Sequence, residues 1–267
     1  MNHVYFYVTF TESSVPVVQP NKLPICKPGI HTLGSSGYWF KEEWNPLNCR
    51  KFNCWHQDAT LIGKCLRNKE IYVLGDSNGR QYTTGISDVM TQVSNADDTN
   101  PYNITVQFVF HPEAIGSRFV PLSAFKYEVD ILDRLNNSEC NYILIFSIWA
   151  HFTQWPRDAF YDRLYHLRDN LAQFRKRCPD VPVFFKSPHP RDHSSFAAIV
   201  YGSDFILYGI RGMLLEVFGD EPGVMFLDIW GMNSAYLSKN NVHMPLVVIH
   251  EELAMIYSTL CPTMCKD

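Results

Sequence analysis

The sequence lacks several features that would point to common classes of protein. Its eight cysteines include no CxxC pair, which argues against a structural zinc site. Basic residues are not in excess, since the net charge is −4, and we expect no nucleic acid partner. No apolar run approaches the ~20 residues that span a bilayer. The first ten residues also lack the basic start of a signal peptide.

The composition that remains is that of a folded domain from an oxidising compartment. Hydrophobic residues make up 46% of the chain and charged residues 19%, which suits a large core. An even number of cysteines favours disulfide bonds over reduced thiols, and the sequons at Asn103 and Asn136 agree with that interpretation. We therefore expect the secretory pathway, in the Golgi lumen or outside the cell, with a targeting segment that these residues do not show.

Strand and helix patterns alternate from residue 70 to the end. Residues 1–30 read as an extended lead-in, and residues 31–68 as loops that are stapled rather than packed. Expected strands lie at 71–74, 104–111, 142–148, 181–185 and 224–227, and expected helices at 79–90, 124–135, 157–177, 205–218 and 245–260. This alternation predicts one three-layer α/β/α domain over residues 31–267, with a mainly parallel sheet and a cysteine-rich N-terminal extension.

Gly75-Asp76-Ser77 follows the first expected strand and precedes a helix. A serine at such a turn exposes its hydroxyl at the sheet edge, where backbone N–H groups can hold an oxyanion. We expect Asp76 to lie among the residues that face the oxyanion or substrate, and the alternative is that Asp76 or Ser77 only caps the helix. His243, in the loop before the last helix, can act as the base for Ser77, or it is a surface histidine.

Other polar residues also fall at expected strand ends. His151 and Trp149 can donate to a substrate oxygen or pack beside it, and Arg80 can bind an anion or form a surface ion pair. The segment 186–193 is polar and proline-rich, and its His-x-x-x-His spacing suits a metal only on a helix, which the prolines oppose. We expect no metal site, and the chain has no GxSxG motif of an α/β-hydrolase lipase.

Several segments together resemble the PC-esterase domain of the neurexophilin and PC-esterase (NXPE) family. They are Gly37-Tyr-Trp, Trp44-Asn-Pro, Gly75-Asp-Ser-Asn-Gly-Arg-Gln, Ser147-Ile-Trp-Ala-His-Phe, the stretch from Phe218 to Met232, and Asn241-Val-His243. The resemblance covers residues 22–262 in order and implies an SGNH-hydrolase-like, flavodoxin-like fold. It implies acyl transfer to, or removal from, glycan hydroxyls such as those of sialic acid, with acetyl-CoA as a possible acyl donor.

The sequence departs from this family at two points. The family usually carries a neurexophilin-like domain before this one, and almost none of it is present. The aspartate of the family's DxxH motif corresponds to Asn240, which can orient the His243 ring but cannot offset its positive charge. Asp228, after the last expected strand, is a possible substitute. An inactive secreted protein that binds glycans or proteins is therefore the alternative to an O-acetyltransferase or esterase.

Overall fold

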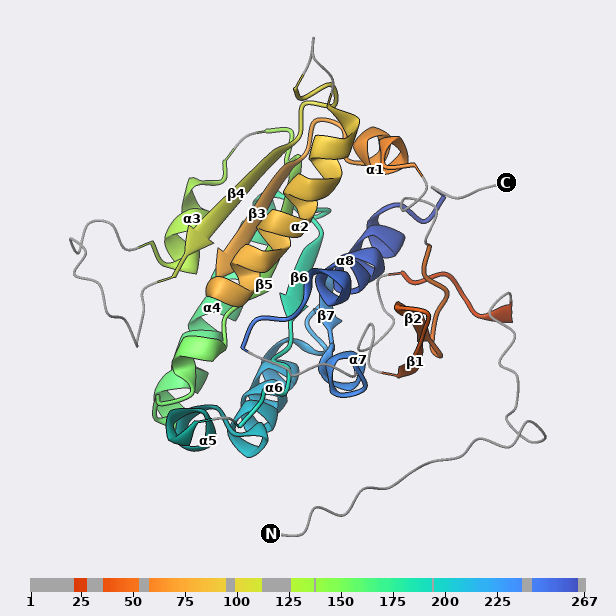
Figure 1. Ribbon diagram of the computed structural model, residues 1–267. Coiled ribbons are helices and arrows are strands. Elements are labelled where there is room, and N and C mark those ends of the chain that lie inside the picture. The colour runs from red at the N-terminus through yellow and green to blue at the C-terminus, as the bar shows by residue number, and fades with distance from the viewer. Residues whose placement is uncertain are drawn as a thin grey trace.

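The computed structural model describes residues 22–27, 36–52, 58–94, 99–111, 126–136, 138–193, 195–236 and 242–263. Its centre is a sheet of five strands: β3 (Glu70–Gly75), β4 (Thr105–Phe110), β5 (Tyr142–Ser147), β6 (Val183–Lys186) and β7 (Val224–Leu227). They pair in the order β4-β3-β5-β6-β7, and every pair is parallel (Figure 1). All five strands therefore end at one edge of the sheet, where ligands bind in folds of this kind.

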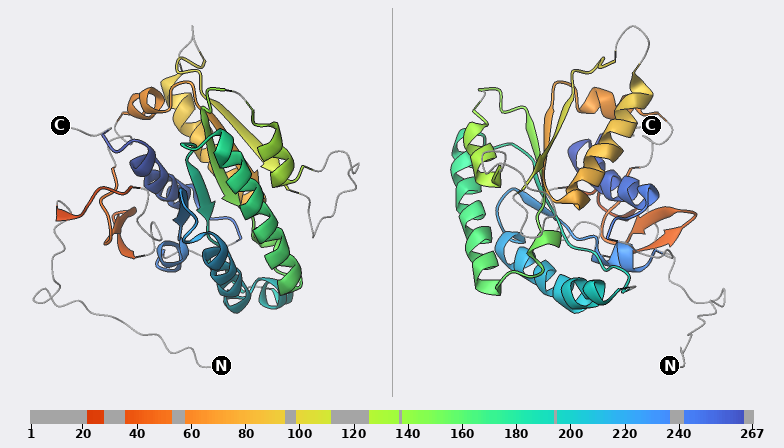
Figure 2. Two further views of the ribbon diagram at one scale, coloured as in Figure 1. Left: turned by 180° about the vertical axis from the view of Figure 1, so that it is seen from behind. Right: turned by 60° about the vertical axis from the view of Figure 1, so that its left-hand side comes forward.

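Helices cover both faces of this sheet (Figure 2). One face packs against α1 (Thr60–Cys65), α2 (Ser77–Val93), α7 (Trp230–Ser234) and α8 (Leu246–Leu260). The other packs against α3 (Glu128–Arg134), α4 (Arg157–Arg177) and α6 (Asp204–Phe218). The short α5 (Phe196–Gly202) and the 3₁₀ helix η4 (Ala150–Phe152) lie towards the end where the strands finish. The predicted three-layer fold is confirmed.

The expected strands and the longest helices occur within a few residues of their predicted positions. The bounds of α4 are those expected, because Phe160, Leu164, Leu167 and Leu171 recur at helical spacing and are buried. α2 begins two residues earlier than expected, at Ser77, because Asp76 caps it. Three short α-helices, α1, α5 and α7, were not predicted, and residues 124–125 of the expected third helix lie outside the described residues.

Disulfides at Cys49 and Cys65 staple residues 31–68 as predicted, but the prediction that this segment is not packed was wrong. The hairpin of β1 (Gly37–Phe40) and β2 (Glu43–Pro46) packs on the core, and Trp44 is 1% exposed. The Trp44 amide donates to the buried carboxylate of Glu251 on α8 at 2.7 Å, and Lys51 pairs with the same carboxylate. The N-terminal segment is thus a layer outside α8. Residues 1–21 of the expected lead-in lie outside the described part of the chain.

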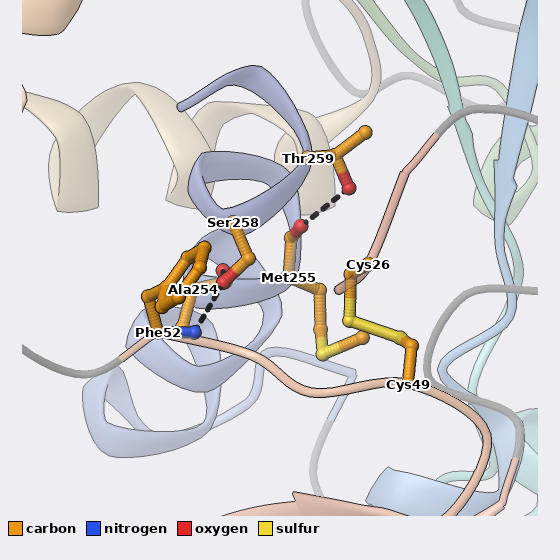
Figure 3. Close-up of a disulfide and its surroundings, with 7 residues drawn as sticks. All are labelled: Cys26, Cys49, Phe52, Ala254, Met255, Ser258 and Thr259. Carbon is orange, nitrogen blue, oxygen red and sulfur yellow. Dashed lines mark hydrogen bonds between the residues drawn. A yellow bond between two sulfur atoms is a disulfide. The ribbon is translucent and has the colours of Figure 1, made fainter. Parts of the chain in front are cut away.

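Three disulfides join the described cysteines: Cys26–Cys49, Cys65–Cys261 and Cys140–Cys178. The first lies against α8, close to the bond that the Phe52 amide donates to Ser258 Oγ at 2.6 Å (Figure 3). The second joins α1 to the residue after α8. Because disulfides persist in oxidising compartments, these bonds confirm the prediction of an oxidising environment.

One helical stretch of the described chain has the length and composition of a membrane span, contrary to the expectation that none exists. It runs over Ala198–Phe218, with a mean hydropathy of 1.3, and one third of it is buried. Ser203 interrupts it, with the extended ψ of 152° that caps α6. Leu207, Leu214 and Phe218 lie in the core against the sheet. A core helix passes the same test of composition, so the finding is weak evidence for a span.

Candidate active site

The turn between β3 and α2 places Ser77 at the carboxyl edge of the sheet. Gly75 makes the turn possible, because its φ is 150° and a Cβ there would lie 2.0 Å from the Ser147 carbonyl oxygen. The Asp76 amide donates to that same oxygen at 3.0 Å. Ser77 is then the first residue of α2, where backbone N–H groups lack partners within the helix.

Asp76 fixes this turn with both carboxylate oxygens. Oδ1 accepts from the Asn78 amide at 2.8 Å, and Oδ2 accepts from the Ala150 amide at 2.7 Å and the Trp149 amide at 3.4 Å. The side chain is fully buried. The sequence placed Asp76 among residues facing an oxyanion or substrate. The structure instead makes it the brace between β3 and η4, since a carboxylate would repel a negative oxygen.

The Ser77 and His243 side chains meet across 166 positions of the chain. Ser77 Oγ lies 2.8 Å from His243 Nε2, which is hydrogen-bonding distance. Gln81 holds the neighbouring Met244, because Gln81 Nε2 donates to the Met244 carbonyl at 2.7 Å and the Met244 amide donates to Gln81 Oε1 at 3.2 Å. Gln81 lies one turn beyond Ser77 on α2, so a single helix positions both members of the pair. Sequence analysis gave Gln81 no role.

Burial and positive neighbours lower the pKa of His243. Burial is the largest cause, and the charges of Arg80, Lys186 and Arg191 act in the same direction. The Asp76 carboxylate opposes them, since its negative charge raises the His243 pKa. His243 therefore stays neutral, and able to accept a proton, to a lower pH than an ordinary histidine.

Asp228 is committed to a different partner. Its carboxylate accepts from Arg211 Nε at 2.9 Å and from the second guanidinium nitrogen at 2.5 Å, and its side chain is 1% exposed. This two-pronged ion pair joins α6 to the end of β7. Within the described residues, Asp228 bonds to Arg211, Ser187 and Trp230 and not to His243. Asn240 lies outside the described residues.

The other residues expected at the site differ in burial and in the groups that they contact. Trp149 is buried, with its ring edge-on to that of His189 at 5.1 Å, so it packs beside the site. Arg80 is exposed, with its guanidinium over the Phe108 ring at 5.9 Å. His151 is half-buried, and its Nδ1 lies 3.2 Å from His111 Nε2. Sequence analysis did not anticipate His111, because nothing near it in the chain marks it as polar and buried.

The segment 186–193 packs against the turn that carries Ser77. His189 is fully buried, its Nδ1 lies 3.0 Å from the Pro190 carbonyl, and its Nε2 lies 3.2 Å from the Asn78 side-chain amide. Burial lowers the pKa of His189 to about 4, so the ring is neutral and braces the residue after Ser77. Across the described ranges, no three His, Cys, Asp or Glu side chains converge in a way that could hold a metal ion.

An apolar cavity of about 390 Å³ lies apart from the Ser77–His243 pair. Its walls come from η4, the start of α4 and α6, and include Phe152, Trp155, Phe160, Phe205 and Met213. Neither Ser77 nor His243 contributes to its lining. It is therefore not the place where the pair would act.

A doubly covered parallel sheet with a Ser–His pair at its carboxyl edge defines an α/β protein of the SGNH-hydrolase type. Residues 44–261 match the family described as NXPE family member 4-like, C-terminal domain. The chain therefore belongs to the NXPE family, as the sequence motifs predicted.

Solved structures that resemble this fold include two carbohydrate esterases and a lipase-like protein. Est24, a carbohydrate acetylesterase from Sinorhizobium meliloti, is 11% identical, with a TM-score of 0.47 over 71% of this chain and 96% of its own. A family two carbohydrate esterase from Clostridium thermocellum, in complex with cellohexaose, is 13% identical, with a TM-score of 0.41 over 72% and 64%. A protein described as a GDSL-like lipase from Parabacteroides merdae is 11% identical, with a TM-score of 0.44 over 72% and 97%. At these sequence identities and TM-scores, the likenesses do not indicate which substrate this protein uses.

Proposed function

We propose that this protein transfers an acyl group, most simply acetyl, to or from glycan hydroxyls through Ser77. The observation that supports it is the 2.8 Å contact between Ser77 Oγ and His243 Nε2 at the start of a helix. His243 would take the hydroxyl proton as Ser77 Oγ attacks the carbonyl carbon of the donor. The Ser77 backbone N–H would hold the negative oxygen of the tetrahedral intermediate.

The second half of the reaction would use the same two residues. His243 returns its proton to the leaving alcohol or thiol, and the acyl group stays on Ser77 as an ester. A glycan hydroxyl or water then attacks that ester, giving its proton to His243, and Ser77 is restored. Transfer results when the sugar is the acceptor, and hydrolysis results when water is. A thioester such as acetyl-CoA is the donor that we propose for transfer.

The charges around His243 suit an anionic substrate. Arg80 is exposed, Arg191 is half-buried, and both are close enough to lower the His243 pKa. A sialic acid or the phosphates of a CoA donor would bring the complementary negative charge. We therefore propose sialic acid among the acceptor sugars, with the secretory pathway as the location where such glycans are met.

Covalent labelling of Ser77 is the direct test. A fluorophosphonate probe should add one label to the wild-type protein, as read by intact mass and peptide mapping, and none to Ser77→Ala. Ser87→Ala, a change on the same helix, should label like the wild type. A folded wild-type protein that stays unlabelled by both this probe and the smaller p-nitrophenyl acetate would contradict the proposal. That result would favour the inactive binding protein of the same fold.

Removing the positive charge at Arg80 should shift the pH dependence of acylation. Arg80 lowers the pKa of His243, so Arg80→Gln should raise that pKa, and the rise in kcat/KM should begin at a higher pH. The direction follows because only the neutral imidazole accepts the serine proton. The measurement is kcat/KM for p-nitrophenyl acetate, a neutral substrate, against pH. Arg67→Gln, an exposed arginine on another segment, should leave the profile in place, and a shift to lower pH in Arg80→Gln would refute the assignment.

A further inference from the structure

Two histidine rings lie in contact beside the nucleophile turn. The His111 amide donates to the Gly75 carbonyl at 3.1 Å, and Ala150, the residue before His151, donates to the Asp76 carboxylate. The ring nitrogens His111 Nε2 and His151 Nδ1 are 3.2 Å apart. The rings are tilted by only 22°, with centroids 5.1 Å apart. The two rings are therefore nearly parallel, and the contact between their nitrogens is of hydrogen-bonding length.

A buried carboxylate faces the far side of the His111 ring. Glu128, on α3, is 4% exposed, and its Oε2 accepts from Arg163 of α4 at 2.6 Å. Its other oxygen, Oε1, lies 3.7 Å from His111 Nδ1. Both of these atoms are buried, and neither has another partner among the described residues. At 3.7 Å the contact between them is electrostatic and longer than a hydrogen bond, and no other described group offers a hydrogen bond to either atom.

This pairing decides which nitrogen of His111 carries the proton. Burial, with His151 and Arg163 contributing, lowers the pKa of His111 to about 2, so the ring is neutral and has a single N–H. Burial raises the pKa of the Glu128 carboxyl, while the Arg163 guanidinium, 2.6 Å away, favours its ionised form. As the ion-pair partner of Arg163, the carboxylate only accepts hydrogen bonds. A proton on Nδ1 gives an attraction to Glu128, whereas a lone pair there would face a negative oxygen. His111 Nε2 is consequently an acceptor.

The proton on His151 follows from the proton on His111. With His111 Nε2 accepting, the 3.2 Å contact requires His151 to donate from Nδ1. A neutral His151 then carries its lone pair on Nε2. The His151 ring is half-buried, and its Nε2 has no hydrogen bond to another described residue. Nε2 is also not one of the buried polar atoms that lack a partner, so it is accessible from outside. Nε2 is therefore open to a ligand at the carboxyl edge.

We propose that Glu128, acting through His111, fixes His151 as the tautomer whose bare Nε2 accepts a hydrogen bond from a substrate hydroxyl. This inference rests on the proposed function of the Ser77 site. It reverses the role expected from the sequence, in which His151 donates to a substrate oxygen. His151 would touch the acceptor sugar, while Glu128 and His111 are positioning residues. Such a site selects hydroxyl-bearing acceptors, because an acceptor that lacks the O–H leaves Nε2 unpaired.

The tautomers can be measured without any turnover. In the wild-type protein, long-range ¹⁵N–¹H correlation spectra should show His111 and His151 both protonated on Nδ1. Glu128→Gln can donate its amide to His111 Nδ1 and still accept from Arg163, so it should reverse the chain and put the His151 proton on Nε2. Asp133→Asn, an exposed change of the same kind on α3, should leave both rings as they were. A wild-type His151 protonated on Nε2, or no change in Glu128→Gln, would overturn the proposal.

Kinetics then test whether the tautomer matters for the acceptor. Glu128→Gln should lower kcat/KM for a glycan acceptor by roughly tenfold, the effect of losing one hydrogen bond, while fluorophosphonate labelling of Ser77 keeps its wild-type rate. His151→Phe should show the same split. Equal losses in labelling and acceptor use would mean a structural role and would overturn the proposal. Because the tautomer spectra need no reaction, they remain decisive even if labelling were to refute the proposed function.

Discussion

Ser77→Ala and His243→Ala should each lower the rate of ester cleavage by about 10⁴-fold or more. The two side chains act as one unit, since Oγ is a poor nucleophile until Nε2, at 2.8 Å, accepts its proton. Removing either partner leaves the other without a function. The double variant should therefore be no slower than the worse single variant, which kcat for p-nitrophenyl acetate and for an acetylated glycan would show.

Thermal unfolding serves as the control for these variants. Ser77 and His243 form no part of the described core clusters, so both changes should leave the unfolding midpoint near that of the wild type. Effects of the two substitutions that multiply in the double variant would mean that the residues act independently. That outcome would contradict a nucleophile–base pair.

Lys186→Met should lower the free energy of unfolding by about 3–5 kcal/mol. Lys186 is 1% exposed at the end of β6, and its Nζ lies 2.6 Å from Glu252 Oε2 on α8. The other carboxylate oxygen accepts from Asn233 at 2.9 Å, and Nζ lies 4.3 Å from the centre of the Tyr82 ring. Removing the cation leaves a fully buried carboxylate without its counter-charge, which accounts for the size of the effect.

A second substitution separates the lost charge from lost packing. Lys186→Met combined with Glu252→Leu removes both charges and should recover much of the stability, because an apolar pair of similar volume can replace a buried ion pair. Lys176→Met, an exposed lysine at the end of α4, should change stability by less than about 0.5 kcal/mol. Urea unfolding followed by tryptophan fluorescence measures all three. A double variant less stable than Lys186→Met alone would show that the ion pair is not the cause.

The sequence predicts the sheet and the long helices because periodicity records burial. Phe160, Leu164 and Leu171 mark the inner side of α4, and the apolar run of β5 marks a strand buried on both faces. The hairpin β1–β2 gives too short a signal, since its strands have four residues each, and in β2 only Trp44 and Pro46 are buried. Its packing depends on contacts with α8, about 200 residues away, which no local pattern contains.

The candidate site was predictable where one motif carries the chemistry. Ser77 follows a strand and glycine, and His243 precedes the last helix, so their meeting follows from topology. The cap that Asp76 provides was among the predicted roles, but its bond to η4 and the partner of Asp228 did not follow. A carboxylate at a strand end looks the same in sequence whether it accepts from distant backbone amides or from an arginine. The Glu128–His111 contact is equally invisible in sequence, since it depends on how α3 sits beside β4.

The packing of the N-terminal hairpin and α1 against α8 sets an order for biosynthesis. A nascent chain emerges from the ribosome with Trp44 and Cys65 already made, but the residues that cover and bond them, on α8 and at Cys261, are translated about 200 residues later. Until then the indole and the thiol stay exposed, which is the state on which chaperones and, in an oxidising compartment, disulfide isomerases act. The folding of α8 should end the binding of chaperones and isomerases, and the same step brings His243 to Ser77. An immature chain would therefore be retained and inactive.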